Sequence, residues 1–264
     1  MNETAPWPKK VKRLLQKANA PEFLHHYGPK TYHLWQHVLV LAIRQECKLG
    51  YRRACKLLTD FGFTVPTYSA ISKIASRLPT ELWNKIKKAT LCAAKVAVAS
   101  VDASTFSRSI PSYHYLRRID RSAPYGRPVK TTFLVDTRTR KILDVVCRVI
   151  PRHDVLDVPK VLKNANILTL VADKGYDSEK IHALCYRRGI KAMIPRRRRV
   201  KKGFYRRKMA KLFRMRTYHR RETSESVFAR VKQCYGNFVR CRSARTIRAE
   251  IYMRVILHNL AMLF

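Results

Sequence analysis

Residues 168–173, Leu-Thr-Leu-Val-Ala-Asp, and residues 98–102, Val-Ala-Ser-Val-Asp, are two short apolar runs that each end on a carboxylate. Short runs rich in apolar and β-branched residues, bounded by polar turn residues, are typical of buried strands. On an open α/β sheet, ligands gather beyond the carboxyl ends of the strands. The two runs therefore predict a sheet with Asp102 and Asp173 at its functional edge, although either aspartate alone is also an ordinary polar turn residue.

Patterns elsewhere in the second half of the chain agree with a sheet of this kind. Alternating apolar residues predict strands, and apolar residues at helical spacing predict helices. In chain order the predicted elements are strands 96–101, 130–135 and 142–149, a helix 155–164, a strand 167–172, a helix 178–188, a strand 190–194, and helices 222–235 and 246–264. A three-stranded meander followed by strand-helix units is the order of an RNase H-like α/β fold, although order alone leaves other α/β folds open.

The sequence pattern of the first 90 residues predicts mainly helices. Four prolines break any long helix before residue 30 and predict an arm or loosely packed lead-in: Pro6, Pro8, Pro21 and Pro29. Helices are then predicted at 31–47, 51–58, 66–78 and 81–90. This order is compatible with helix-turn-helix geometry or with a supporting bundle, and the basic residues of its middle helices favour DNA binding. We expect an all-helical, helix-turn-helix-like DNA-binding module at 1–90 and an RNase H-like catalytic domain at 91–264.

The charge of the chain limits its partners. Its 264 residues include 56 Lys and Arg against 17 Asp and Glu, a formal net charge of +39. Neutralising phosphates releases condensed counterions, so such a chain favours nucleic acid. An acidic membrane surface is the weaker alternative, because Asn2 stands where myristoylation needs glycine and no signal peptide or prenylation box is found. Seven cysteines without a C-x-x-C pair favour reduced thiols, and we expect a cytoplasmic, nucleoid-associated protein without membrane contact.

A third acid stands in a predicted helix. Residues 218–232 read Tyr-His-Arg-Arg-Glu-Thr-Ser-Glu-Ser-Val-Phe-Ala-Arg-Val-Lys. On one continuous helix, four chemically useful side chains share a sector of roughly 60°: Tyr218, Arg221, Glu225 and Lys232. The alternative is a solvated basic helix with surface ion pairs. Three carboxylates in a basic protein suit Mg²⁺, which takes oxygen ligands, and two such ions can assist phosphodiester hydrolysis.

The spacing of these residues resembles the Y-(2)-R-(3)-E-(6)-K signature of the transposases of insertion-sequence family four. Residues 173–178, Asp-Lys-Gly-Tyr-Asp-Ser, resemble the block around the second catalytic aspartate in that family and in the related family five. Residues 101–104, Val-Asp-Ala-Ser, resemble the first block, and the whole resemblance covers about residues 95–260. The turn 136–140 lacks a glycine and no large insertion precedes the glutamate, so the compact family-five kind fits better.

The resemblance implies a DDE transposase with an RNase H-like catalytic domain. Asp102, Asp173 and Glu225 would be its catalytic and metal-binding residues, with Mg²⁺ or Mn²⁺ as cofactor and two ions expected. Three further residues would contact the phosphates and displaced bases at the transposon end: Tyr218, Arg221 and Lys232. The implied partners are double-stranded DNA, both inverted repeats and target, and a second copy in a homodimer on DNA. An RNase H-like endonuclease or resolvase without strand transfer, and a catalytically inactive DNA-binding protein, remain as alternatives.

A basic run lies between the last predicted strand and the helix that carries the glutamate. It contains Arg196, Arg197, Arg198, Arg199, Lys201 and Lys202. Charge runs are usually solvated or disordered. The aromatic residues that follow, Phe204 and Tyr205, favour instead a DNA-clamping loop beside the active site, which would contact the DNA backbone without reading sequence.

Overall fold

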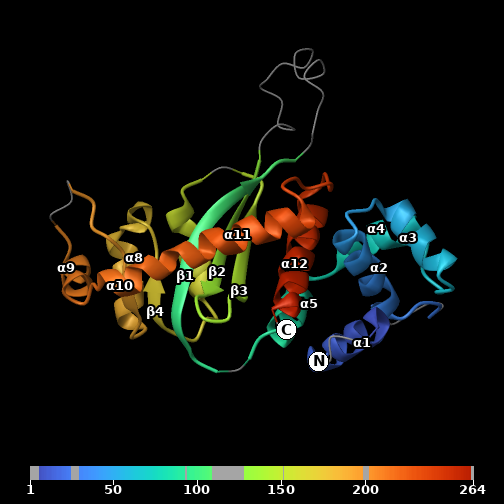
Figure 1. The fold of residues 1–264 in the computed structure, drawn as a ribbon, viewed down its shortest axis with the longest axis horizontal. Coiled ribbons are helices and arrows are strands. Elements are labelled where there is room, and N and C mark those ends of the chain that lie inside the picture. Colours follow the sequence, from blue (N-terminus) through green and yellow to red (C-terminus); the bar gives the residue numbers. More distant parts are fainter. Residues whose placement is uncertain are drawn as a thin grey trace, which may run out of the picture. The chain divides into compact units, whose positions relative to one another are not determined.

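The computed structural model describes residues 6–24, 30–92, 94–108, 128–150, 152–198 and 202–262. The chain divides into two compact units, which are described separately below (Figure 1). The helical unit comprises residues 1–92 together with 231–264, and the sheet unit comprises residues 93–230. The first division therefore falls between residues 92 and 93, and residues 231–264 group with the N-terminal helices.

The sheet unit is built on five strands within the described residues: β1 (Val96–Phe106), β2 (Val129–Asp136), β3 (Ile142–Arg148), β4 (Ile167–Val171) and β5 (Lys191–Met193). Their order across the sheet is β3-β2-β1-β4-β5. The pairs β1–β2 and β2–β3 are antiparallel, whereas β1–β4 and β4–β5 are parallel. The predicted α/β class is confirmed, and the meander followed by parallel strands is compatible with an RNase H-like fold.

The first strand is longer than predicted. We expected it to end at Asp102, but β1 continues to Phe106 because its antiparallel partner β2 pairs with it up to Val129. The parallel neighbour β4 stops at Val171, opposite Ser100. Asp102 therefore lies inside β1, at the place where the sheet ends on the β4 side.

Helices and short turns of the sheet unit follow the strands. They are η2 (Asp154–Asp157), α7 (Val158–Leu162), η3 (Lys174–Tyr176), α8 (Glu179–Arg187), α9 (Phe204–Lys211), α10 (Met215–Tyr218), η4 (His219–Arg221) and α11 (Glu222–Tyr235). The main core packs residues of α7 and α8 against Ala99 and Val101 of β1. Side chains alternate between the faces of a strand, so Ser100 and Asp102 face the opposite side, where Figure 1 shows the first part of α11 crossing the sheet.

Helix α9 was not predicted. Its residues form a helix although they follow directly on the basic run, because the Glu179 carboxylate accepts hydrogen bonds from the backbone N–H groups of Tyr205 (2.8 Å) and Arg206 (3.1 Å). These donors at the start of a helix have no partner within the helix itself. A distant acid thus caps α9, and its buried Met209 joins the core.

The helical unit contains α1 (Trp7–Lys17), α2 (Leu34–Glu46), α3 (Tyr51–Asp60), α4 (Tyr68–Arg77), α5 (Thr80–Ala89) and α12 (Ala244–Ala261). The expectation of a loose arm before residue 30 was wrong for α1, which buries Val11, Leu14 and Leu15. Proline is tolerated in the first turn of a helix, so Pro6 and Pro8 start this helix instead of breaking it. The described helices include none that is long and apolar enough to cross a membrane.

Helix α12 explains why the C-terminal segment belongs to the helical unit. It contacts α2, α4 and α5 and is buried on nearly all sides. Its Glu250 accepts hydrogen bonds from Arg254 Nη2 (2.8 Å) and, at 3.4 Å, from Arg44 Nη2 of α2. Buried charges require such partners. The two ends of the described chain therefore share one core.

Candidate active site

The register of the sheet brings two of the three acids together. In the parallel pair β1–β4, Ser100 lies beside Val171. The same offset places Asp102 beside Asp173, which follows β4 after one residue. Because side chains alternate along a strand, Asp102 faces the same side as Ser100, and Asp173, just beyond the end of β4, is near enough for its charge to act on Asp102.

The start of α11 is fixed to the same face. Ser100 Oγ lies 3.2 Å from the carbonyl oxygen of Arg221 and 3.0 Å from Ser224 Oγ. Further along the helix, Phe228 stacks on Phe133 of β2 with ring centroids 4.2 Å apart and planes 6° from parallel. These contacts hold the first turn of α11, and with it Glu225, over the strand that carries Asp102.

The three acids act on one another electrostatically. Burial raises the pKa of Asp102, and the negative charges of Glu225 and Asp173 raise it further. The hydrogen bond from the Ala103 N–H (2.8 Å) and the positive charge of Arg221 oppose this rise without cancelling it. The structure therefore gathers Asp102, Asp173 and Glu225 in one electrostatic environment, where a cation would relieve their repulsion.

The stripe expected along residues 218–232 is not a single helix. Helix α10 ends at Tyr218 and a 3₁₀ turn intervenes before α11 begins at Glu222. Tyr218 consequently packs beside Phe213 (ring centroids 5.6 Å apart), against an apolar cluster on the sheet. Lys232 lies in the part of α11 that belongs to the helical unit and is half-buried. Arg221 forms an ion pair with Glu225, and its guanidinium also lies over the ring of Tyr218, 6.0 Å from the ring centroid.

The carboxylates of Asp102 and Asp173 suit a hard divalent cation, whereas that of Glu225 has another partner. One Asp102 oxygen is bonded to a backbone N–H, and the Asp173 carboxylate has no hydrogen bond or ion pair with the described residues, so both offer oxygen ligands of the kind Mg²⁺ prefers. Glu225 is paired with Arg221 instead. As these side chains stand, the described residues contain no group of three His, Cys, Asp or Glu arranged to hold a metal ion. In the structure Glu225 is thus paired with Arg221 and is not grouped with the two aspartates as a metal site.

A comparison with known families identifies the domain that carries these residues. A family model described as "Transposase DDE domain" matches residues 98–260, well over half of the chain. The chain belongs to this transposase family. No curated protein sequence shows significant similarity to it. The resemblance to DDE transposases is thereby confirmed at the level of the domain family, and the matched DDE domain contains all three acids.

Asp177 of the DDE domain is a residue whose role the sequence did not reveal. Its buried carboxylate accepts hydrogen bonds from Arg206 Nε (2.7 Å) and from the backbone N–H of Arg197 (2.9 Å), and lies 3.0 Å from His182 Nε2. Burial favours a higher pKa, but these three partners hold the pKa of Asp177 below its ordinary value. The only signal was its place in the block 173–178.

Asp177 connects the basic run to the loop that follows Asp173. Arg197 also donates to the carbonyl oxygens of Lys174 (3.1 Å) and Gly175 (2.6 Å). Four residues of the run are exposed, namely Arg196, Arg197, Arg198 and Lys202, whereas Arg199 and Lys201 lie outside the described residues. The beginning of the run is therefore held beside the candidate active site by hydrogen bonds that involve its backbone.

Replacing Asp177 with Asn should loosen this attachment. The amide keeps the shape but loses the charge that binds Arg206 and Arg197, and hydrogen bonds to charged groups contribute about 1.5–3 kcal/mol. We expect trypsin to cut at Arg196–Arg198 at least about tenfold faster, because the open form becomes more populated. Asp60→Asn, an exposed aspartate in the helical unit, is the matched control. Equal cutting of the two variants would show that Asp177 does not hold the run.

Proposed function

We propose that this chain is a transposase that cleaves DNA at transposon ends and transfers the freed strand into target DNA, with Asp102, Asp173 and Glu225 as its catalytic residues. The observation that carries the proposal is the hydrogen-bonded attachment of α11, which carries Glu225, to the strand that carries Asp102, inside a transposase DDE domain. Each acid comes from a different element, since Asp102 lies in β1, Asp173 follows β4 and Glu225 lies in α11.

The three carboxylates would hold divalent cations, for which we propose two Mg²⁺ or Mn²⁺ ions. When bound, such ions lower the pKa of an attacking water and stabilise the charge of the leaving oxygen. Asp102 and Asp173 lie near enough for their charges to interact and would provide the fixed ligands. Glu225 would join them on release from Arg221, whose guanidinium then becomes available to a DNA phosphate.

The two chemical steps are balanced substitutions at phosphorus. In the first, a water oxygen attacks the phosphorus at the transposon end, the bond from phosphorus to the 3′ oxygen breaks, and a 3′-hydroxyl and a 5′-phosphate result. In the second, that 3′-hydroxyl attacks a target phosphodiester and releases a target 3′-hydroxyl. The protein holds the two reactants in line, which supplies much of the rate.

The charge of the chain supports duplex DNA as the partner. Phosphate contacts would come from the exposed members of the basic run, and contacts to the transposon end from Tyr218, Arg221 and Lys232. Two ends must be joined in one event, for which we propose a homodimer on inverted repeats. We propose that the protein acts in the cytoplasm at the nucleoid, where such DNA lies.

A cleavage and joining assay tests the proposal. The substrate is a duplex carrying the inverted repeat that flanks the gene, incubated with the full chain, target plasmid and Mg²⁺ or Mn²⁺. We expect nicking at the repeat and covalent joining to the plasmid, and Asp102→Ala or Asp173→Ala should lower both at least about 10³-fold while duplex binding survives. Nicking without joining would indicate an endonuclease. Binding without nicking by the unaltered chain would indicate an inactive DNA-binding protein.

A further inference from the structure

A pocket of about 360 Å³ lies inside the helical unit, between the end of α4, the start of α5 and the first turns of α12. Its size falls at the lower end of the range for small-ligand sites. The lining residues are Ser76, Arg77, Leu78, Pro79, Thr80, Trp83, Arg245, Arg248 and Ala249. Three of these nine are arginines and none is acidic.

The three arginines differ from the paired arginines elsewhere in the chain. Arg44 and Arg254 share Glu250, and Arg148 binds Asp154 and Asp157. By contrast, none of the pocket arginines forms an ion pair with a described residue. The lining arginines of α12 follow its first residue, where positive charge opposes the helix dipole. Helix stability therefore does not account for their position.

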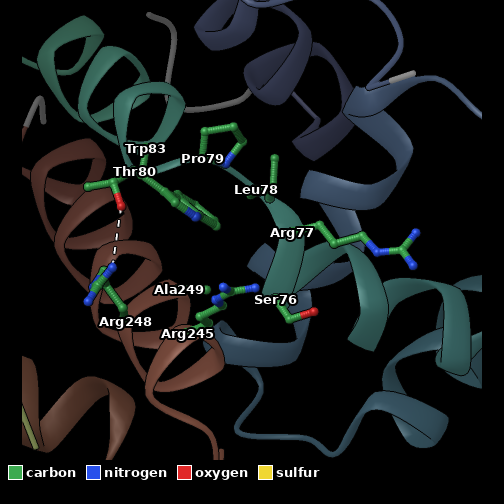
Figure 2. A pocket seen from close by; sticks show the side chains of 9 residues that line it. All are labelled: Ser76, Arg77, Leu78, Pro79, Thr80, Trp83, Arg245, Arg248 and Ala249. Atoms are coloured by element: carbon green, nitrogen blue, oxygen red, sulfur yellow. Dashed lines mark hydrogen bonds between the residues drawn. The ribbon is translucent and has the colours of Figure 1, made fainter. Parts of the chain in front are cut away.

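Figure 2 shows how the polar groups of the pocket are arranged. Arg245 and Arg248 project from α12 towards the pocket, and Arg77 points away from it at the rim. Arg248 Nη1 donates to Thr80 Oγ1 over a long 3.4 Å. This weak bond leaves most donors of the guanidinium available, and the hydroxyl hydrogen of Thr80 has no acceptor among the described residues.

A tryptophan completes the lining. Trp83 is only 2% exposed, and its ring reaches from α5 into the pocket (Figure 2). Its indole N–H makes no hydrogen bond with the other lining residues drawn in Figure 2. Guanidinium, hydroxyl and indole N–H groups thus line the pocket as donors, and none of the lining residues is acidic.

From this donor set we propose that the pocket binds a phosphate group of duplex DNA, with Arg245 and Arg248 as the main ligands and Thr80 and Trp83 as supporting donors. Arginine binds phosphate through paired N–H groups, which fixes its orientation. The proposal deepens the proposed function by assigning the helical unit a defined DNA contact. A contact of this kind positions the duplex and does not read its sequence.

A binding assay without metal separates this proposal from the catalytic one. The full chain is titrated with a duplex closed by hairpins at both ends, which has only backbone phosphates, and with the same duplex opened to carry one 5′-phosphate. Arg245→Gln combined with Arg248→Gln should weaken binding about tenfold or more and lower the slope of log affinity against log salt by about one to two. The control is Arg13→Gln combined with Lys17→Gln, which removes the same charge from exposed positions of α1.

The two duplexes identify the source of the phosphate. An effect on both supports a backbone phosphodiester, and an effect confined to the open duplex supports a terminal phosphate. Equal losses of affinity and slope in the pocket variant and the α1 variant would overturn the proposal. Circular dichroism of the pocket variant, unchanged at the temperature of the assay, shows that the effect is not unfolding. Because this assay measures binding and not cleavage, its result can be interpreted even if the proposed cleavage chemistry is wrong.

Discussion

Replacing Glu225 with Gln should lower metal-dependent nicking at least about 10³-fold while DNA binding is kept or slightly strengthened. The amide has the size of the carboxylate but lacks the charge that a divalent cation requires. Glu225 lies in the first turn of α11, which Ser100 and Ser224 attach to the strand bearing Asp102. The measurement is nicking of a duplex carrying the transposon end, at saturating DNA.

The matched control is Glu222→Gln, three residues earlier on the same helix. Glu222 is exposed, and an acid in the first turn stabilises the helix through its dipole. Glu225 is one of the main groups that raise the pKa of Asp102, and Glu222 is not among them. The Glu222 variant should keep most of the activity. The opposite ranking of the two variants would overturn the assignment of Glu225 and with it the alignment to the family signature.

Glu250→Gln should destabilise the helical unit by about 3–5 kcal/mol, because it leaves Arg44 and Arg254 buried without their counter-charge. Burial alone would raise the pKa of Glu250, but the two arginines, aided by hydrogen bonds, hold it below the ordinary value of 4.5. A carboxyl group with a lowered pKa stabilises the fold above its unfolded pKa. This stabilisation is thus complete at neutral pH and is lost as the pH falls below about 4.5.

Urea unfolding of the full chain measures this effect. Glu81→Gln is the control, since Glu81 is an exposed helix residue of the same unit and its variant should change stability by less than about 1 kcal/mol. The cost of the Glu250→Gln substitution should be constant near neutral pH, begin to fall below about pH 4.5, and disappear only below the lowered pKa of Glu250 in the folded chain. A loss of stability equal to that of the control would mean that the buried triad is not a stabilising element.

The sequence was sufficient to predict the elements that its apolar patterns define. Strands β1 to β5 and helix α11 were predicted because each has a regular apolar face, and the position of Asp173 followed from the end of β4. The end of β1 was not predictable in this way, because it depends on pairing with β2 beyond Asp102. The break between Tyr218 and Glu222 was also missed, since angular arguments assume one continuous helix.

Features that depend on distant partners could not be predicted. The cap of α9 comes from Glu179, and Asp177 holds Arg197 across a separation of 20 residues. The prolines before residue 30 predict a loose arm, whereas Pro6 and Pro8 stand at the start of α1 and are compatible with it. The pocket with Arg245 and Arg248 forms between helices that are far apart in the sequence. In these cases the local sequence has no distinctive pattern, and the structure depends on a residue that is distant in the sequence.

The shared core of the helical unit has a consequence for biosynthesis. Arg44 and its partner Glu250 are 206 residues apart. At a translation rate of about 5–20 residues per second, roughly 10–40 s pass between the synthesis of the two. During that interval α2 lacks its packing partner α12, so the face of α2 that α12 covers, with Arg44, stays exposed on the ribosome-bound chain. The sheet unit, encoded between them, is free to fold first, and the helical unit closes only after the last helix has emerged.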